Sequence, residues 1–421
     1  MDITIVSIGS RGDVQPFVAL ALGLLDNGHQ VTIAAPQNFE NFVKSFGINF
    51  HALPNNTEEV ITSVEGEKLL KKGSTIGILK FFKREGTKRR VAIRSSLLEC
   101  CVNTELIITS YITTYAIAII SEKLNKKWAV VNLNPPIIKT GELPAMSFSL
   151  FNFPWYNKFT YDIIHFIEWR INKEDIQEFR KSLGLLPLSM SFSKYMDQQK
   201  IPIISAISSQ IFKKPSDWKS HHYISGFLTL PANKNKLSDP INHDLKEWIN
   251  DGDKPIYIGF GSIPFPDKNL LLNILNELLE RTNLRILFCK GWTKIDILPV
   301  NKKLFVCDSL DHEFILPLCQ TAIIHGGIGT ITAVLKSKIP VIILSIFADQ
   351  PYWGQLIERK KCGAHFPAQK INTSKLLSLI KYCSCSKIMK NAQILGSALS
   401  NENGVKSCVE ILENIFIKIK I

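Results

Sequence analysis

The chain has 421 residues, of which 45% are hydrophobic and 21% charged, and its formal net charge at pH 7 is +13. This composition is typical of a soluble globular protein, and the length predicts two domains. No apolar run reaches the roughly 18 residues that a membrane-spanning helix needs. No RNA-binding or helix-turn-helix signature accompanies the positive charge, so nucleic acid is not an expected partner.

The first half begins as a β-α-β pattern. Residues 3–8 form an apolar run that suits a buried parallel strand, and a helical apolar stripe begins at Pro16. Further strands are expected at 31–35, near 106–109 and near 129–132. Because strands alternate with helices, the pattern predicts a doubly wound α/β sheet.

A basic stretch, Lys68–Arg94, holds ten Lys or Arg residues against Glu85 alone, which gives +9 in 27 residues. Apolar side chains are interspersed in it, namely Ile76, Ile78, Leu79, Phe81 and Phe82. This mixture predicts either peripheral contact with an anionic membrane or a solvated basic helix or loop.

Prolines and aromatic residues dominate between about 136 and 200. The aromatic side chains are Phe148, Phe151, Phe153, Trp155, Tyr156, Phe159 and Tyr161. They are expected either to form a wall for an apolar acceptor or to pack into an ordinary core.

A second alternating series follows a polar, turn-rich segment. Strands are expected at 256–260, 284–289, 304–306, 322–324 and 341–344, with a helix at 268–282. We predict an N-terminal acceptor-binding domain at 1–228, a linker at 229–253 and a C-terminal nucleotide-sugar-binding domain at 254–400. Residues 401–421 are expected to form a helix that packs back on the first domain.

A glycine-rich turn, His325-Gly-Gly-Ile-Gly-Thr330, follows the strand that ends at Ile324. Glycines let the main chain approach a pyrophosphate closely, and the next helix presents unpaired N–H groups. His325 can donate a hydrogen bond to a phosphate oxygen. Taken alone, the turn fits equally well a plain strand-to-helix connection capped by the histidine.

Asp349-Gln350-Pro351 follows the next strand, at the edge where ligands gather in open α/β sheets. The carboxylate and the amide can bind sugar hydroxyls, and Asp-Gln-Pro also fits a helix N-terminus. Ser262 follows the first strand of the same domain and is a candidate phosphate contact, with a plain turn as the alternative. The pair of segments indicates a nucleotide-sugar site and therefore glycosyl transfer.

Transfer of a sugar to a hydroxyl needs a base near the acceptor oxygen. Asp13 follows the first strand in the loop Ser10-Arg-Gly-Asp13 and is the best-placed candidate. It can also cap the following helix, and the two roles are compatible.

Nine cysteines are scattered without a CxxC pair, and Asp2 precedes a β-like run, not the basic start of a secretory signal. We therefore expect reduced thiols without a metal or disulfide role, in a cytoplasmic protein that associates at most peripherally with membrane.

These motifs together resemble the GT-B fold UDP-glycosyltransferase superfamily, which includes sterol glucosyltransferases and bacterial macrolide, glycopeptide and glycolipid glycosyltransferases. Residues 9–16 are similar to that family's opening motif. Lys290-Gly-Trp292, Ser309-Leu-Asp-His312 and the His325 and Asp349 segments follow the family order. The resemblance covers 1–55 and 255–366 and fades across 56–250, where the acceptor is normally recognised. In the sequence Ile324 replaces a second histidine that many sterol-type members have.

The resemblance implies two Rossmann-like domains facing across a cleft. It also implies inverting, metal-independent transfer of a hexose, often glucose from UDP-glucose, without a cofactor beyond the UDP-sugar co-substrate. Asp13 would be the catalytic base. The donor-binding residues would be Arg11, Gly12, Ser262, Trp292, Leu310, His325, Gly327, Gly329, Thr330, Asp349 and Gln350.

The acceptor is expected to be an apolar molecule with a hydroxyl, such as a sterol, polyketide, flavonoid or lipid. Two alternatives stay open. One is a membrane-docked glycosyltransferase that makes glycolipids, and the other is a nucleotide-binding protein without transferase activity.

Overall fold

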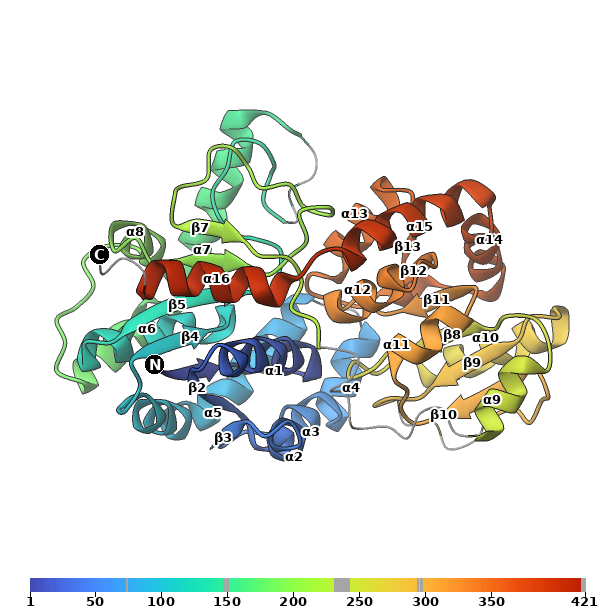
Figure 1. Cartoon of the computed structure of the whole chain (residues 1–421), viewed down its shortest axis with the longest axis horizontal. Coiled ribbons are helices and arrows are strands. Elements are labelled where there is room, and N and C mark those ends of the chain that lie inside the picture. The colour runs from blue at the N-terminus through green and yellow to red at the C-terminus, as the bar shows by residue number, and fades with distance from the viewer. Residues whose placement is uncertain are drawn as a thin grey trace. The chain divides into compact units, whose positions relative to one another are not determined.

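The computed structural model describes residues 1–72, 75–146, 148, 151–230, 243–293, 295 and 298–417. Their contacts divide the chain into two compact units. The first contains Met1–Asn56, Arg89–Thr229 and Asn403–Ile421, and the second contains Thr57–Lys88 and Leu230–Glu402 (Figure 1). Residues 231–242 of the predicted linker lie outside the described residues.

The first unit is built on a parallel sheet with the strand order β3-β2-β1-β4-β5-β6-β7. Its strands are β1 Asp2–Val6, β2 Gln30–Pro36, β3 Asn49–Leu53, β4 Leu106–Thr109, β5 Lys127–Asn132, β6 Ile203–Ser205 and β7 His222–Ile224. Its helices are α1 Arg11–Asp26, α2 Glu40–Lys44, α6 Thr114–Leu124, α7 Pro154–Ser182, α8 Phe192–Gln198 and α16 Gly404–Phe416, with one-turn 3-10 helices at Gln37–Phe39 and Tyr111–Thr113.

The second unit has a parallel sheet with the order β10-β9-β8-β11-β12-β13. Its strands are β8 Ile256–Gly259, β9 Ile286–Cys289, β10 Leu304–Cys307, β11 Thr321–Ile324, β12 Val341–Ser345 and β13 Gly363–Pro367. Its helices are α9 His243–Asn250, α10 Lys268–Arg281, α11 His312–Ile315, α12 Ile328–Lys336, α13 Gln350–Arg359, α14 Thr373–Cys383 and α15 Ser386–Ser400, with 3-10 turns at Leu316–Leu318 and Ala368–Lys370.

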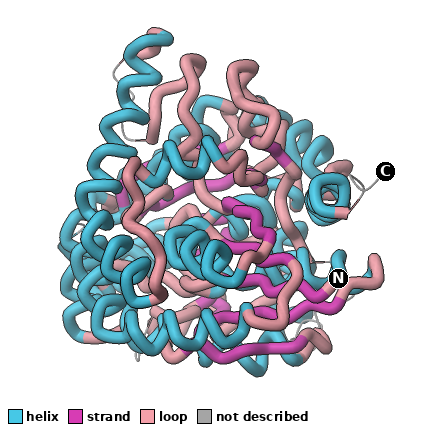
Figure 2. Tube along the Cα trace, turned by 90° about the vertical axis from the view of Figure 1, so that its left-hand side faces the viewer, coloured by secondary structure: helices cyan, strands magenta, loops and turns pink. Residues whose placement is uncertain are grey.

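Central strands of both sheets are apolar and buried along their whole length. All five residues of β12 and all four of β4 and β11 are buried. Alternate residues of a strand point to opposite faces, so continuous burial requires that both faces of the sheet are covered by helices. Figure 2 shows the strands inside the helical layers. The predicted doubly wound α/β architecture is confirmed. Among the described helices, none is both long and apolar enough to cross a bilayer.

The first helix begins earlier than the sequence predicts. The predicted start at Pro16 is wrong, because α1 begins at Arg11 and Pro16 lies inside it. Ser10 and Asp13 form a capping box that stabilises the first turn before the proline is reached.

Residues Thr57–Lys88 group with the second unit, although they lie between β3 and β4 of the first. They contain α3 Thr57–Ile61, α4 Val64–Lys72 and the first half of α5 Thr75–Cys101. Ile61, Leu70 and Ile78 are buried in the hydrophobic core of the second unit. The predicted boundary of 1–228 for the first domain therefore differs from the division by contacts in this segment.

The last helix, α16, packs on α1 within the first unit, although the two lie at opposite ends of the sequence (Figure 1). Gly23 of α1 permits this contact, because an added Cβ there would overlap Val405 of α16. His29 Nε2 and Glu413 Oε1, 3.2 Å apart, add a polar contact between the end of α1 and α16.

Gly23→Ala is expected to lower the thermal unfolding midpoint, because the added methyl group overlaps Val405. Overpacking of this kind costs about 1–3 kcal/mol. Val405→Ala makes room for the new methyl group. In the Val405→Ala background, Gly23→Ala should therefore cost clearly less, as measured by calorimetry on the four variants of the cycle. Equal losses of stability in the wild-type and Val405→Ala backgrounds would show that the overlap with Val405 is not what destabilises Gly23→Ala.

Candidate active site

In the second unit the strand order reverses between β8 and β11, which are hydrogen-bonded neighbours. Open parallel sheets bind ligands at such a reversal, outside the carboxyl ends of the strands. Gly261 and Ser262 follow β8, and His325 follows β11. A Cβ added at Gly261 would lie 3.8 Å from Cε1 of His325. The fold therefore brings Ser262 and His325, far apart in the sequence, to one place.

His325 is buried, with 7% of its surface exposed, and its Nδ1 has no hydrogen-bond partner among the described residues. Burial, with a smaller contribution from His312, lowers the pKa of His325 to about 4. Nε2 of His312 lies 2.9 Å from the buried Tyr257 hydroxyl. At neutral pH His325 is therefore an uncharged imidazole with an unsatisfied ring nitrogen, and a ligand that offers hydrogen bonds would satisfy it.

The turn after His325 depends on its glycines. Gly326 has a φ of +99°, a left-handed conformation that other residues rarely adopt. A Cβ at Gly327 would lie 2.6 Å from Nε2 of His325, so the glycine lets the ring approach the start of α12. A Cβ at Gly329 would meet no atom within 4 Å, so the first turn of α12, with Thr330, is open to a ligand on that side. Its unpaired N–H groups favour an anion.

In the loop after β12, Asp349 and Gln350 are held in place by hydrogen bonds of their own side chains. Asp349 Oδ2 accepts a hydrogen bond of 2.7 Å from Trp353 Nε1, and burial raises the pKa of Asp349. Gln350 is buried, and its Oε1 accepts from the N–H groups of Ile346 and Phe347 at 2.7 and 3.2 Å. The side-chain amide oxygen of Gln350 thus stabilises the turn itself, a role that the sequence pattern did not predict. Ala348, which directly precedes Asp349, has a φ of +56°, and such strain is concentrated at functional sites.

Two further loops extend the same edge. Trp292 follows β9, and its backbone N–H donates a hydrogen bond to the Gly261 carbonyl at 2.9 Å. Gly291 has a φ of +53°, and a Cβ there would overlap that carbonyl oxygen. Leu310 follows β10 and is half-buried. The predicted donor residues of the second unit therefore follow five neighbouring parallel strands at their carboxyl ends.

In the first unit the order reverses between β1 and β4, and Asp13 follows β1. Its Oδ2 accepts hydrogen bonds from the Ser10 N–H at 2.7 Å and the Ser10 hydroxyl at 3.1 Å. A Cβ at Gly9, whose φ is +152°, would overlap this carboxylate. Asp13 therefore has the capping role that the sequence offered as one of its two roles.

Arg11 and Gly12 are exposed at the start of α1. Arg11 Nε donates to Gln15 Oε1 at 3.0 Å, and its guanidinium lies 4.7 Å from the ring centre of Phe42. These contacts hold the Arg11 side chain within its own unit.

The sequence analysis missed Tyr111 and Glu168. Ser110 N–H donates to the Val6 carbonyl at 3.0 Å, which places the end of β4 beside that of β1. The next residue, Tyr111, donates its hydroxyl to Glu168 Oε1 of α7. Burial raises the pKa of Glu168 and raises that of Tyr111 well above its ordinary value. No sequence signal links the two residues, because α7 joins the site only through the fold.

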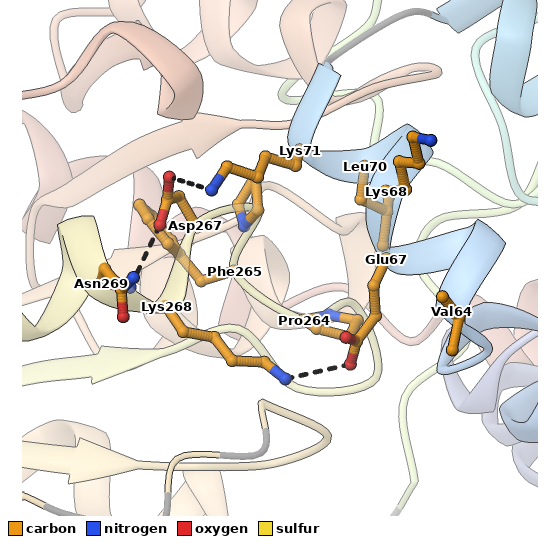
Figure 3. Close-up of a pocket in the computed structure, with 11 residues that line it drawn as sticks. Val64, Glu67, Lys68, Leu70, Lys71, Pro264, Phe265, Asp267, Lys268 and Asn269 are labelled. Carbon is orange, nitrogen blue, oxygen red and sulfur yellow. Dashed lines mark hydrogen bonds and ion pairs between the residues drawn. The ribbon is translucent and has the colours of Figure 1, made fainter.

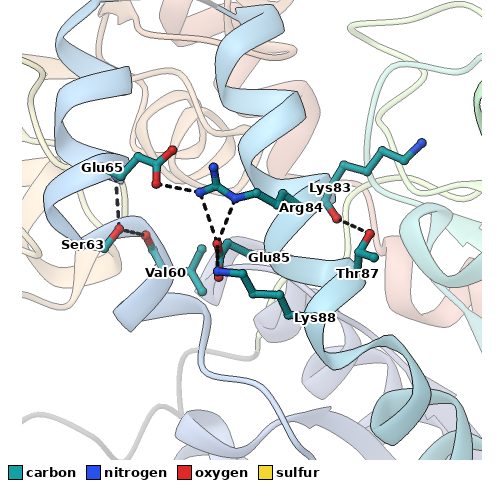
Figure 4. Close-up of polar contacts among 9 residues, drawn as sticks. Val60, Ser63, Glu65, Lys83, Arg84, Glu85, Thr87 and Lys88 are labelled. Carbon is teal, nitrogen blue, oxygen red and sulfur yellow. Dashed lines mark hydrogen bonds and ion pairs between the residues drawn. The ribbon is translucent and has the colours of Figure 1, made fainter.

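Among the described residues, five of the ten cations of the basic stretch Lys68–Arg94 form ion pairs: Lys71, Arg84, Lys88, Arg90 and Arg94. Lys71 lies 2.9 Å from Asp267, and Lys268 lies 3.1 Å from Glu67, across a pocket of the second unit (Figure 3). None of the predicted site residues is among those that line this pocket. Arg84 pairs with Glu65 at 2.6 Å, and Lys88 with Glu85 at 2.7 Å (Figure 4). Arg90 and Arg94 both pair with Asp175 of α7.

The described apolar side chains of this stretch pack within the second unit. Ile78 and Phe81 are buried, and Phe82 packs against Phe347 with ring centres 6.5 Å apart. The side chains of Ile76 and Leu79 lie outside the described residues. The alternative of a solvated basic helix therefore describes α5 better than that of a membrane-binding stretch.

One group of described residues has the composition of a metal site: Asp197, His221 and His222, whose candidate ligand atoms lie within 4.8 Å of one another. Lys219 Nζ already lies 2.8 Å from Asp197. His222 begins β7, so the group lies at the amino ends of the strands, away from Asp13. Asp251 and Asp253 likewise precede β8, at the amino end of that strand, whereas His325 follows the carboxyl end of β11. The two acids therefore lie away from His325. Neither group contributes to the candidate site.

Residues 3–127 match the family model of the glycosyltransferase family 28 N-terminal domain. A sterol 3-beta-glucosyltransferase of Arabidopsis thaliana is 31% identical over 425 residues, which cover 97% of this chain and 65% of that protein. One of Komagataella phaffii is 26% identical over 439 residues, covering 97% of this chain and 34% of that protein. The chain thus spans from about two thirds to one third of the length of these two curated relatives.

Solved structures with the same fold include the glycosyltransferase of kitacinnamycin, with a TM-score of 0.68 and 12% identity over 98% of both chains. The calicheamicin glycosyltransferase CalG4 has a TM-score of 0.67 and 13% identity over 100% of this chain and 99% of that one. These likenesses establish the fold. The resemblance read from the motifs is confirmed: the chain has the GT-B fold, is similar to the sterol 3-beta-glucosyltransferases over nearly its whole length, and matches the glycosyltransferase family 28 N-terminal domain over residues 3–127.

Proposed function

We propose that the chain is an inverting, metal-independent hexosyltransferase that moves glucose from UDP-glucose to a hydroxyl of an apolar acceptor. The observation that carries this proposal is the position of His325 and the glycine turn at the strand-order reversal of the second sheet. The similarity to sterol 3-beta-glucosyltransferases supports it over nearly the whole chain.

In this proposal the diphosphate binds at the start of α12. The N–H groups of the first turn and the positive end of the helix dipole would hold its oxygens, with Gly329 permitting a close approach. Ser262 and Thr330 would add hydroxyl contacts, and Trp292 and Leu310 would lie near the nucleoside. Asp349 would bind the sugar hydroxyls, and Gln350 would do so through Nε2 while its Oε1 holds the turn.

His325 would assist departure of the diphosphate. Its pKa is about 4 without a ligand, and a neighbouring anion favours the protonated ring. The imidazole would donate a hydrogen bond to the phosphate as negative charge develops there. Together with the helix terminus it would stabilise the charge that a metal ion stabilises in other enzymes.

Asp13 would act as the base. Its carboxylate would take the proton of the acceptor hydroxyl while the oxygen attacks the anomeric carbon and the bond to the diphosphate breaks. A single displacement inverts the anomeric configuration. The hydrogen bonds from Ser10 fix the direction of the carboxylate, which is what a general base requires.

The acceptor class rests on the relatives. Both relatives are sterol 3-beta-glucosyltransferases. We propose that the acceptor of this chain is a sterol or a molecule of similar apolarity and shape. The rate of transfer by an Asp13 variant distinguishes this proposal from the alternative of nucleotide binding without transfer.

Asp13→Asn is expected to lower the rate of transfer by about 10²–10⁴-fold, because general-base catalysis contributes this much. The amide oxygen can still accept the Ser10 hydrogen bonds, so UDP affinity, measured by calorimetry, should be unchanged. Ser10→Ala is the matched control, because it removes a cap contact and leaves the carboxylate. Full transfer by Asp13→Asn would exclude the base role, and loss of UDP binding would show a structural effect.

Gly329→Ala is expected to weaken UDP binding about tenfold or more, because the new methyl group stands where the diphosphate approaches the helix. The fold should tolerate it, since the Cβ meets no atom within 4 Å. Gly86→Ala in α5 is the control, with an equally open position away from the site. Unchanged UDP affinity in Gly329→Ala would place the diphosphate elsewhere.

Transfer is expected to continue in excess EDTA, because α12 and His325 supply the stabilising charge. The measurement is the initial rate with UDP-glucose and a sterol, before and after chelation. A rate that falls to the background with EDTA and returns only with Mg²⁺ or Mn²⁺ would contradict metal independence.

A further inference from the structure

A group of three metal-ligating side chains lies in the first unit, away from the candidate active site. Asp197 belongs to α8, His221 directly precedes β7 and His222 begins it. One ring nitrogen of each histidine and one carboxylate oxygen lie within 4.8 Å of one another. We call these three residues the α8–β7 cluster. The fold thus brings three potential ligands from two separate segments to one place.

The described part of the chain leaves one ring nitrogen of each histidine in the cluster unsatisfied. Nδ1 of His222, a residue with 5% of its surface exposed, is buried without a hydrogen-bond partner among the described residues. Nε2 of His221 is also buried, and Asp197 Oδ1, at 3.6 Å, is too far away to accept a hydrogen bond from it. Burial lowers the pKa of His222 to about 4 and also lowers that of His221, so both rings are uncharged at neutral pH. Two unsatisfied nitrogens at one buried place indicate a ligand that both can bind.

The two histidine rings lie close together although the residues are neighbours in the sequence. Successive residues of a strand point to opposite faces. Here the His222 N–H donates to the Lys219 carbonyl at 3.1 Å, which closes a turn just before β7. In this backbone the ring centres of His221 and His222 are 4.3 Å apart. Trp218 packs edge-on against His222, with ring centres 6.0 Å apart. The His222 ring is therefore held in place by its neighbours, as a pre-organised ligand has to be.

The charges around the cluster allow a metal ion but weaken its binding. Lys219 Nζ lies 2.8 Å from Oδ2 of Asp197, whereas the oxygen beside His221 is Oδ1. The ammonium group therefore pairs with one carboxylate oxygen, and the other is the one that faces the histidine. Lys200 and Lys214 add positive charge near the two rings. These cations would repel a metal ion, and Lys219 would do so most because it contacts a ligand residue.

We propose that the α8–β7 cluster binds a zinc ion. Two imidazole nitrogens and a carboxylate oxygen are ligands that zinc prefers, whereas Mg²⁺ and Ca²⁺ prefer oxygen alone. His221 Nε2 and Asp197 Oδ1, 3.6 Å apart, already have about the separation of two ligands on one tetrahedral zinc, since each bond is about 2.0–2.2 Å long. A water molecule would take the fourth position. The ion would join α8 to β7 and stabilise the first unit, and it does not depend on the transfer chemistry proposed above.

Titration with zinc tests the site. The full chain, prepared without a histidine tag and treated with a chelator, is expected to bind one Zn²⁺ ion per chain in calorimetry. His222→Gln should weaken binding about a hundredfold or more, because loss of a group that merely orients a ligand already costs about 10–100-fold. His243→Gln is the matched control, because it removes an exposed histidine of α9 and should leave the zinc affinity unchanged.

Two charge variants with opposite expected effects test the geometry, and they keep the test open if His222→Gln does not fold. Asp197→Asn should weaken zinc binding about tenfold or more, because the charged ligand is lost. The Asp197 side chain is 45% exposed, so the fold should tolerate the change. Lys219→Gln should tighten binding about tenfold, because it removes a positive charge beside the ion. Equal zinc affinities in Asp197→Asn, Lys219→Gln and the wild type would overturn the proposal.

X-ray absorption at the zinc edge identifies the ligands directly. Nitrogen and oxygen at about 2.0–2.2 Å are expected, whereas sulfur at about 2.3 Å would show that zinc binds to some of the nine cysteines and would overturn the proposal. Absence of zinc binding by the wild type would overturn it too. Zn²⁺ should also raise the thermal unfolding midpoint of the wild type and leave that of His222→Gln unchanged.

The zinc site and the proposed function fail separately. UDP affinity and the rate of transfer in excess EDTA measure the function, and neither involves the α8–β7 cluster. Chelation is expected to lower the thermal unfolding midpoint while the rate of transfer, measured well below that temperature, stays the same. A chain that transfers glucose but binds no zinc would lose only the site proposed in this cluster.

Discussion

The parallel arrangement of the strands is the constraint on which the site depends. All strands of one parallel sheet end at the same edge, so loops that are distant in the sequence become neighbours there. In the second unit this edge collects Ser262, Trp292, Leu310, His325 and Asp349. The reversal of strand order between β8 and β11 makes the loop of Gly261 and Ser262 the neighbour of His325. In the first unit the same reversal, between β1 and β4, brings Asp13 and Tyr111 to one edge.

Burial then determines the chemistry of the polar groups at these edges. His325 is neutral because burial disfavours its charged form, and the same effect raises the pKa values of Asp349 and Glu168. Glycines permit the close contacts: Gly9 makes room for the Asp13 carboxylate, and Gly327 for the His325 ring. The sites are thus held by short-range packing. Burial thus favours the uncharged form of all three groups, and a bound anion would favour the charged form of His325 alone.

In two segments, the burial of the side chains differs from what the composition of the segment indicates. The basic stretch Lys68–Arg94 combines positive charge with apolar residues, yet Ile78 and Phe81 are buried and Arg84, Lys88, Arg90 and Arg94 are paired. The aromatic residues between 151 and 171 fit a core by composition, yet Trp155, Phe159 and Phe166 are exposed. Which residues are buried is decided by what packs against them, and composition does not record this. The core-packing alternative is therefore wrong for Phe151, Phe153, Trp155 and Phe159, and it holds for Tyr161, which is buried.

The sequence by itself determined nine of the described strands, the two-sheet α/β architecture, the GT-B resemblance and the edge of each sheet that carries the predicted residues, although it missed β3, β6, β7 and β13. It could do so because apolar periodicity and glycine turns are local properties of the chain. Only the tertiary structure decided that α1 begins at Arg11, that Gln350 stabilises its own turn, and that Tyr111 contacts Glu168. It also decided that residues 57–88 pack with the second unit. The Tyr111–Glu168 contact and the packing of residues 57–88 join segments that are distant in the sequence, and a local pattern does not record such contacts. The Ser10–Asp13 cap and the Gln350 contact are local, but the sequence also allowed other roles for Asp13 and Gln350.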